Sequence, residues 1–251
     1  MKKLLEFKNV KYFYQTKESE VEALSDISFC LLDKSFTSLV GPSGCGKTTI
    51  LSLTAGLLTP SSGEILLDGK KVEENDSRIG YMFQRDHLFE WRTIWENITL
   101  GLELKGLKKD EEKLSLAQTL LQKYDLYNFK NKKPRQLSGG MRQRVALIRT
   151  LVLEPDLLLL DEPFSALDFQ TRLKVCDDVY SIIKSEEKTA LLVTHDISEA
   201  LSMSDEVLIL SKWPAVVKES LSLSFVGQTP LHKREDPTFG NYFEKIWRSL
   251  V

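Results

Sequence analysis

The sequence predicts an α/β fold built around a mainly parallel sheet, with a helical subdomain inserted into it. Three observations support this prediction. Short apolar runs alternate with helical patterns, which is typical of parallel strands joined by helices. A glycine-rich loop joins one apolar strand to a helix over residues 36–57. A long helical pattern, about 85–153, separates two of the apolar runs.

The first third of the chain is expected to contain several strands. Residues 4–14 alternate loosely and are rich in aromatic and branched side chains, which favour strands. The strands expected in this third are 4–14, 27–32, 36–40, 64–67 and 79–83. A helix follows the glycine-rich loop to about Leu57, and turn residues at 59–63 separate it from the next strand.

Helical spacing replaces strand patterns in the middle of the chain. Leu114, Ala117 and Leu121 share one helix face within the stretch from about Gln84 to Leu153. Strands and helices alternate again beyond it. The strands expected there are 157–160, 190–194 and 207–210, with a helix at about 170–184 after the first and a short helix after the second. This return to alternation indicates that the helical stretch is an insertion into the sheet-forming part.

Composition excludes several classes of protein. The chain has 251 residues, of which 42% are hydrophobic and 28% charged, so it is neither disordered nor collagen-like. Its 34 basic and 36 acidic residues lack the basic excess typical of a nucleic-acid binder. Its three cysteines have no disulfide or zinc spacing, which favours a reducing compartment. No run approaches the ~18 apolar residues of a membrane span, so any membrane role is expected to need a partner.

The glycine-rich loop fits the phosphate-binding pattern G-x-x-x-x-G-K-[ST] at every position, and it lies between a strand and a helix as that motif requires. Its residues are Gly41, Pro42, Ser43, Gly44, Cys45, Gly46, Lys47 and Thr48. Glycines let backbone N–H groups surround an anion, and the helix N-terminus adds partial positive charge. Lys47 is expected to reach the β- and γ-phosphates, and the Thr48 hydroxyl to bind Mg²⁺.

Two carboxylates follow an entirely apolar strand at 157–160. Asp161 and Glu162 stand at the carboxyl end of this strand, where ligands of open α/β sheets bind. Beside a phosphate loop, Asp161 is expected to hold Mg²⁺ through water. Glu162 is expected to polarise the water that attacks the γ-phosphate.

A second glycine-rich helix start lies at Leu137-Ser138-Gly139-Gly140-Met141, where Ser138 is a typical N-cap residue. Placed between the phosphate loop and the acidic pair, this stretch resembles the signature loop of ABC-type ATPases, which usually reads Leu-Ser-Gly-Gly-Gln. The resemblance runs from about Leu4 to Leu210. It implies that Ser138, Gly139 and Gly140 contact ATP.

The resemblance assigns roles to further residues. Gln84 matches the Q-loop, residues 165–168 match the D-loop, and His195 matches the switch histidine. A parallel sheet would place His195 beside Glu162. Tyr14 stands where the family stacks an aromatic ring on adenine, with Tyr12 on the same strand face as the alternative.

The resemblance therefore implies a complete site. The expected catalytic residues are Lys47, Gln84, Glu162 and His195. The expected nucleotide-binding residues are Tyr14, Gly41, Pro42, Ser43, Gly44, Cys45, Gly46, Lys47, Thr48, Thr49, Ser138, Gly139 and Gly140. The expected Mg²⁺ ligands are Thr48, Gln84 and Asp161.

The resemblance also implies an architecture. It is a P-loop NTPase core of the RecA-like kind with a mainly parallel sheet, an N-terminal antiparallel β subdomain and an inserted α-helical signature subdomain. The ATPase domain is expected to span 1–220, with its helical subdomain at about 85–153. Residues 221–251 are expected to form a C-terminal extension that ends in a helix.

Several stretches are similar to the branch of the family that serves nitrate, sulfonate and taurine importers. They include 88–91, 141–144, 199–201 and 234–237. This branch also serves importers of vitamin precursors, so the transported solute stays open. The expected function is ATP hydrolysis by the energising subunit of an importer. The alternatives are a soluble ABC ATPase outside transport and a nucleotide-binding regulatory module that does not hydrolyse ATP.

Membership of this branch implies partners and a location. Two copies are expected to pair head to tail and share ATP, and separate integral membrane permease subunits are expected to carry the solute. An extracytoplasmic solute-binding protein is implied indirectly, and nucleic acid is not an expected partner. The protein is expected at the cytoplasmic face of the cell membrane as a peripheral subunit.

Two sets of residues carry further expectations. Phe89, Trp91 and Trp95 are expected to include a residue that faces a partner helix, unless all three pack inside the helical subdomain. The position of Cys45 near a helix N-terminus predicts a lowered thiol pKa.

The tail is expected to form a helix with Asp236 as N-cap and Pro237 as first helical residue. Its apolar face is expected to dock on its own chain. The residues expected on that face are Phe239, Phe243, Ile246, Trp247 and Leu250.

Overall fold

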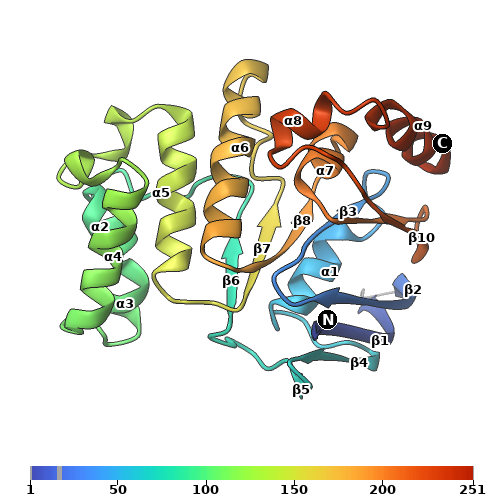
Figure 1. Ribbon diagram of the computed structural model, residues 1–251. Coiled ribbons are helices and arrows are strands. Elements are labelled where there is room, and N and C mark those ends of the chain that lie inside the picture. The colour runs from blue at the N-terminus through green and yellow to red at the C-terminus, as the bar shows by residue number, and fades with distance from the viewer. Residues whose placement is uncertain (1, 16–18, 251) are drawn as a thin grey trace.

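The computed structural model describes residues 2–15 and 19–250. Their strands form one ten-stranded sheet in the order β5-β4-β1-β2-β10-β9-β3-β8-β7-β6. The strands are β1 Lys3–Gln15, β2 Glu20–Leu32, β3 Phe36–Val40, β4 Ser62–Leu67, β5 Lys70–Lys71, β6 Ile79–Met82, β7 Leu157–Asp161, β8 Thr189–Val193, β9 Glu206–Leu210 and β10 Ala215–Ser222. Figure 1 shows helices on both sides of the β3–β8–β7–β6 part.

The helices are distributed along the chain between these strands. They are α1 Lys47–Thr54, α2 Ile94–Ile98, α3 Leu100–Leu104, α4 Glu111–Lys123, α5 Gly139–Leu151, α6 Phe169–Ser185, α7 Ile197–Met203, α8 Pro230–Arg234 and α9 Phe239–Leu250. Two 3₁₀ turns, Tyr127–Phe129 and Pro134–Gln136, lie between α4 and α5.

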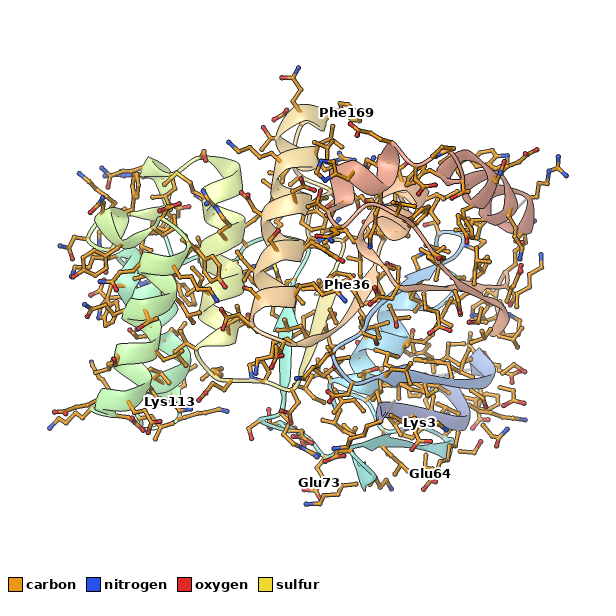
Figure 2. All side chains as sticks on the ribbon, in the orientation of Figure 1. Lys3, Phe36, Glu64, Glu73, Lys113 and Phe169 are labelled. Atoms are coloured by element: carbon orange, nitrogen blue, oxygen red, sulfur yellow. The ribbon has the colours of Figure 1, made fainter. Side chains whose placement is uncertain are left out.

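The parallel part of the sheet confirms the predicted core. Strands β6, β7, β8, β3 and β9 pair parallel in that spatial order. Every residue of β3 and β8 is buried, because helices cover both faces of the sheet here. Phe36, at the start of β3, lies near the middle of the molecule, and its ring contacts Tyr180 of α6 (Figure 2). The carboxyl ends of these strands therefore share one edge, the edge at which the predicted site residues stand.

The N-terminal strands pair antiparallel, as expected for the β subdomain. Strand β1 lies between β2 and β4 and is antiparallel to both. Its inward residues Leu5, Phe7 and Val10 join a core cluster that also contains residues of α1. Strand β2 begins at Glu20, seven residues before the predicted start. The early start was missed because acidic residues interrupt the apolar pattern of this stretch, which nevertheless pairs with β1 and buries Ala23 and Leu24.

The middle of the chain forms a separate helical layer, seen on the left of Figure 1. Helices α2 to α5 share a core with one face of the sheet and with α6. Helix α5 is the inner element of this layer and packs against α6 and β6. This arrangement places the start of α5, at Gly139, beside the D-loop that precedes α6.

The C-terminal extension forms a helix on its own chain, as predicted, but two details of the prediction were wrong. Helix α9 begins at Phe239, and Asp236 instead accepts hydrogen bonds from the N–H groups of Val226 and Thr238 in the preceding turn. The residues that contact the core are Phe239, Tyr242, Ile246 and Leu250. Phe243 and Trp247 are exposed. The cluster beneath α9, built from α7 and β9, is narrower than the apolar face of the helix.

Candidate functional site

The phosphate loop joins β3 to α1 through a backbone that glycine favours. Gly44 and Gly46 have φ angles of 74° and 114°, the left-handed region that side chains disfavour. The Lys47 side chain is buried, and its Nζ donates hydrogen bonds to the carbonyl oxygens of Gly41 at 2.8 Å and Pro42 at 2.9 Å. The ammonium group is therefore held inside the loop, next to the N-terminus of α1.

The acidic pair ends β7, two strands away from β3. Tyr81 of β6 donates a hydrogen bond from its hydroxyl to Oδ2 of Asp161 at 3.0 Å. Burial raises the pKa of Asp161, and the Tyr81 hydrogen bond and the charge of Lys47 oppose that rise. Tyr81 was missed in the sequence. The sequence pointed to Tyr81 as a site residue only through its position on the predicted strand that pairs with the strand before the acidic pair.

Glu162 has an unusual backbone. Its φ angle is 44°, and its N–H donates to the carbonyl of Val193 at 2.8 Å. A non-glycine residue in this region bears strain of order 1 kcal/mol or more, and such strain is concentrated at functional sites. The hydrogen bond to the neighbouring strand holds Glu162 in this conformation.

The predicted pairing of His195 with Glu162 is confirmed. Strands β7 and β8 are parallel neighbours, with Asp161 opposite Val193. This register brings Nδ1 of His195 to 3.0 Å from Oε2 of Glu162. The His195 side chain is otherwise largely exposed, so its other ring nitrogen is open to a bound molecule.

Gln84 and the D-loop reach the same place. Nε2 of Gln84 donates to Oγ of Ser165 at 3.3 Å, and Oγ of Ser165 donates to the carbonyl oxygen of Glu162 at 3.0 Å. A short chain of hydrogen bonds therefore links the end of β6, where Gln84 stands, to the backbone of Glu162.

The signature loop lies apart from the phosphate loop. Ser138 caps α5 by accepting the N–H of Met141 at 3.3 Å, and Ser138 and Gly139 are exposed. With Gly140 they line a groove whose opposite wall includes Leu167 and Asp168 of the same chain. Figure 1 shows α5 on the β6 side of the sheet and α1 on the β3 side. Within one chain, the two glycine-rich loops are therefore not brought together.

The two candidate adenine-stacking residues differ in exposure. Tyr14 is 42% exposed, and its hydroxyl lies 2.9 Å from Oγ1 of Thr49 in the first turn of α1. Tyr12 packs against the N-terminal core cluster and meets the Tyr14 ring edge-on at 4.9 Å. This arrangement favours Tyr14 as the residue available to a ligand.

The expectation for Cys45 was wrong. Burial raises the pKa of the Cys45 thiol, although the charge of Lys47 and backbone hydrogen bonds act to lower it. A Cβ at Gly41 would lie 2.7 Å from the Cys45 sulfur, so the sulfur packs against the loop backbone. The side chain points inward, so desolvation raises the thiol pKa by more than the helix N-terminus and Lys47 lower it.

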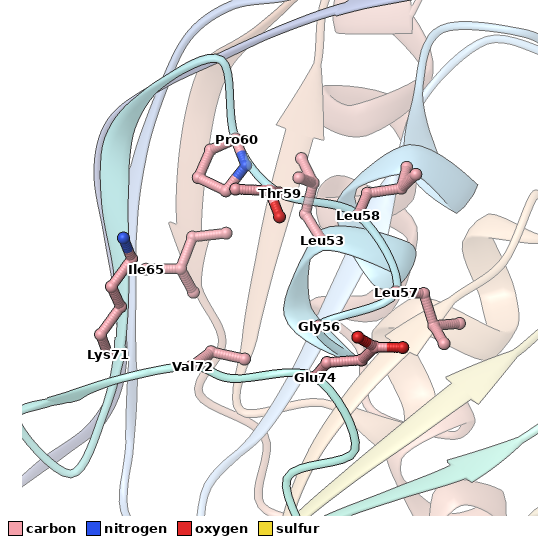
Figure 3. Close-up of a pocket in the computed structure, with 10 residues that line it drawn as sticks. All are labelled: Leu53, Gly56, Leu57, Leu58, Thr59, Pro60, Ile65, Lys71, Val72 and Glu74. Atoms are coloured by element: carbon pink, nitrogen blue, oxygen red, sulfur yellow. The ribbon is translucent and has the colours of Figure 1, made fainter.

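A pocket at the other end of α1 is a different site. Figure 3 shows it lined by Leu53, Gly56 and Ile65, among others. It contains none of the residues predicted to bind nucleotide, and it lies at the C-terminal end of α1, where the helix dipole disfavours anions. The phosphate loop at the N-terminal end remains the candidate site.

Trp91 belongs to an open groove on the helical layer. It is 72% exposed, and its carbonyl accepts a hydrogen bond from Nζ of Lys133 at 2.6 Å. The groove is lined by Trp91, Arg92, Trp95, Glu96, Thr99, Glu103, Lys108, Leu114 and Lys133. Trp95 packs partly against the core of the helical layer, so of these two tryptophans Trp91 is the one free to meet a partner.

Among residues 2–15 and 19–250, no helix combines the length and the apolar character that crossing a bilayer requires.

Known proteins with similar sequences align with most of the length of this chain. A "Taurine import ATP-binding protein TauB" of Roseobacter denitrificans is 39% identical over 231 residues, covering 90% of this chain and 85% of the relative. A "Nitrate import ATP-binding protein NrtD" of Synechocystis is 36% identical, covering 96% and 93%. An "Uncharacterized ABC transporter ATP-binding protein YtlC" of Bacillus subtilis is 43% identical, covering 96% and 94%.

A solved structure and a family model agree with these relatives. The dimeric structure of MJ0796, described as a bacterial ABC transporter cassette, superposes with a TM-score of 0.73 at 33% identity, covering 88% of this chain and 99% of that one. The family model "ABC transporter" matches residues 24–165, which include the phosphate loop, the signature loop and the acidic pair. The chain belongs to the ABC transporter family, and its fold is that of an ATP-binding cassette.

Proposed function

We propose that this protein binds and hydrolyses ATP as the energy-coupling subunit of a membrane importer, acting in a head-to-tail dimer. The observation that carries the proposal is the separation of two phosphate-binding loops within one chain. The Lys47 loop leads into α1, which Figure 1 shows on the β3 side of the sheet, and the Ser138 loop leads into α5 on the β6 side. A second copy placed head to tail would bring its Ser138 loop against the first copy's Lys47 loop.

Binding of ATP would begin at the phosphate loop. Lys47 and the N–H groups at the start of α1 offset the charge of the β- and γ-phosphates. Tyr14 would stack on adenine, and its hydrogen bond to Thr49 ties the ring to the same helix. The signature loop of the second copy would add the N–H groups at the start of α5 on the other side of the γ-phosphate.

Hydrolysis would depend on Glu162. Its carboxylate is positioned to accept a proton from the attacking water, and His195 orients that carboxylate through the Nδ1 contact at 3.0 Å. The exposed nitrogen of His195 is available to hydrogen-bond a γ-phosphate oxygen. Gln84 donates a hydrogen bond to Ser165, and Ser165 donates one to the carbonyl oxygen of Glu162. A movement of Gln84 would therefore be transmitted to the residue proposed as the base.

The residues present fit a magnesium ion. Asp161 offers a carboxylate near Lys47, Thr48 offers an exposed hydroxyl at the start of α1, and Gln84 offers an amide oxygen. Hard oxygen ligands of this kind are those that Mg²⁺ prefers. When bound, the ion would neutralise phosphate charge.

The exposed groove around Trp91 is proposed to receive a segment of the permease. Its apolar ring surface and its mixed basic and acidic rim suit an amphipathic helix. The relatives named for taurine and nitrate import support a small solute of that kind, and a vitamin precursor is the alternative. In this role the protein would lie at the cytoplasmic face of the membrane, bound through the permease, with a solute-binding protein on the other side.

Substitution of Glu162 by Gln tests the ATPase proposal. The variant is expected to lose at least 100-fold in steady-state phosphate release and to form dimers when Mg-ATP is added, because it retains every proposed binding residue. Release of phosphate at the wild-type rate would exclude Glu162 as the base. A strictly monomeric variant in saturating ATP would contradict the shared site.

Substitution of Trp91 by Ala tests the importer proposal, in cells that also express the permease and take up its solute. Solute uptake is expected to fall at least fivefold, while ATP hydrolysis by the isolated subunit changes by less than twofold. Equal losses of solute uptake and of ATP hydrolysis would show that Trp91 is needed for the structure of the subunit and not for coupling.

A further inference from the structure

One arginine joins the segment after Gln84 to the start of the signature helix. Nε of Arg142 donates to Oδ2 of Asp86 at 2.7 Å, and Nη2 donates to Oδ1 at 3.1 Å. Nη1 lies 2.7 Å from Oε1 of Glu90. The guanidinium therefore bridges two carboxylates of one loop. We propose that Arg142 is a positioning residue that couples the Trp91 groove to the signature loop, an inference that rests on the proposed function.

Arg142 is connected to the signature loop by a single turn of helix. The backbone N–H of Arg142 donates to the carbonyl of Ser138 at 3.0 Å, the first hydrogen bond of α5. Gly139 and Gly140 lie inside this same turn. A displacement of the Arg142 side chain is therefore transmitted to the turn that would meet ATP.

The groove end is held as a rigid unit. Asn97 is fully buried and accepts the N–H of Phe89 at 2.7 Å, and its Nδ2 donates to the carbonyl of Thr93 at 2.9 Å. Arg149 of α5 donates to the carbonyl of Asp86 at 2.7 Å. Glu90 lies directly before Trp91, so the loop that carries Trp91 has little freedom to move independently of α5.

The chemistry of this contact requires arginine. Asp86 and Arg142 are partly buried, with side-chain exposures of 18% and 24%. Burial acts to raise the pKa of Asp86, but the hydrogen bonds from Arg142 hold it below its ordinary value, so the carboxylate stays ionised. A planar guanidinium makes two parallel bonds to Asp86 and a third to Glu90. A lysine ammonium lacks this fork and cannot reproduce the geometry.

The test uses the full-length Glu162→Gln chain, in which ATP-driven dimers persist. Arg142→Met keeps the length of the side chain and removes the guanidinium, and Arg142→Lys keeps the charge. Arg248→Met is the matched control, because Arg248 is exposed on α9 and pairs with Glu244 one turn away. Dimerisation is followed by sedimentation against Mg-ATP concentration. Binding of a fluorescent ATP analogue to the monomer reports on the phosphate loop alone.

We expect Arg142→Met to raise the half-maximal ATP concentration for dimerisation about tenfold and Arg142→Lys about threefold, with no effect of Arg248→Met. Nucleotide affinity of the monomer should stay within twofold in all three. Unchanged dimerisation in Arg142→Met overturns the inference. A parallel loss of monomer affinity also overturns it, since a general structural defect would then be sufficient. If the Glu162→Gln parent itself fails to dimerise, the proposed function falls first and the inference with it.

The groove end needs its own readout. Fluorotryptophan labelling gives Trp91 a fluorine resonance, assigned by its disappearance in Trp91→Phe. This resonance is expected to shift when Mg-ATP drives dimerisation and to lose that shift in Arg142→Met at ATP concentrations that still form the dimer. Glu90→Gln is expected to reduce the shift partly, with no further loss when combined with Arg142→Met. A full shift in Arg142→Met would overturn the coupling, and Glu90→Gln keeps the test open if Arg142→Met does not fold.

Discussion

The phosphate loop and the signature loop begin two helices in different ways. The phosphate loop curls around Lys47, with Gly44 and Gly46 at positive φ and the ammonium held by two carbonyl groups. The signature loop has no residue at positive φ, and Ser138 simply caps an exposed helix end. The first loop has a backbone that could surround an anion, and the second presents N–H groups on one side only.

This difference explains why one chain needs both. A loop that surrounds a phosphate binds it without help, because its N–H groups and its lysine converge from several directions. A capped helix start contributes partial charge from a single direction, worth about 0.3–1 kcal/mol when exposed. We therefore expect the phosphate loop to be sufficient for nucleotide binding, and the signature loop to act by closing over a nucleotide that is already bound.

The largest effects should separate binding from closure. Lys47→Ala and Ser138→Arg are each expected to reduce ATP hydrolysis at least 100-fold. Lys47→Ala should also abolish nucleotide binding by the monomer, because it removes the buried cation of the loop. Ser138→Arg should bind nucleotide within a few-fold of wild type and fail to dimerise. Equilibrium binding of a fluorescent ATP analogue distinguishes the two variants.

Mixing these two inactive variants sharpens the same comparison. A heterodimer contains one site with both lesions and one site that is entirely wild type, so partial recovery of ATPase activity is expected. Recovery requires that one intact site turns over alone, and ATP-dependent dimers of Glu162→Gln are the companion measurement. No recovery together with a monomeric Glu162→Gln protein would show that each chain carries a complete site.

Alanine in place of glycine should affect the two loops unequally. Gly46→Ala is expected to destabilise the fold by about 1–3 kcal/mol, because its φ of 114° disfavours a side chain and a Cβ would lie 2.9 Å from Leu24. Gly139→Ala should change stability by less than about 1 kcal/mol, since a helical alanine gains propensity and meets only the Leu167 side chain. Urea denaturation of both variants gives the difference. Equal losses would contradict the contrast in backbone strain.

Adenine is expected to stack only on a residue near the phosphate loop, and not on any residue near the signature loop. Tyr14→Ala is expected to weaken nucleotide binding by the monomer about tenfold, which is ~1.4 kcal/mol and within the range of base stacking. Tyr14→Phe should stay within about threefold, because it retains the ring and loses the hydrogen bond to Thr49. Tyr12→Ala serves as the comparison. A larger loss in Tyr12→Ala, with normal folding, would reverse the assignment.

Local pattern was enough to predict the parts that backbone chemistry dictates. The strand at 36–40, a helix after the phosphate loop and the contact of His195 with Glu162 were predicted, because each follows from a strand end or a glycine position. Contacts made between distant segments were not. Which surfaces meet in the fold determines the Tyr81 hydrogen bond, the Arg142 bridge and the inward face of α9. The periodicity of apolar residues along the sequence does not specify which surfaces meet. Cys45 failed for the same reason, since the inward direction of its side chain determines its desolvation.

The smallest effect concerns the cysteine of the phosphate loop. Cys45 is 1% exposed and its thiol pKa is raised, so at pH 7–8 it forms less thiolate than an ordinary cysteine. Cys30, on β2, is only partly buried. Iodoacetamide at pH 8 should therefore label Cys30 at least ten times faster than Cys45, with sites assigned by peptide mass spectrometry. Raising the pH increases the thiolate fraction of Cys45 and should speed its labelling, and mild denaturant should speed it more because access also limits the reaction. Labelling of Cys45 as fast as Cys30 in the native protein would mean that the loop opens readily, and the enclosed character that distinguishes it from the signature loop would be lost.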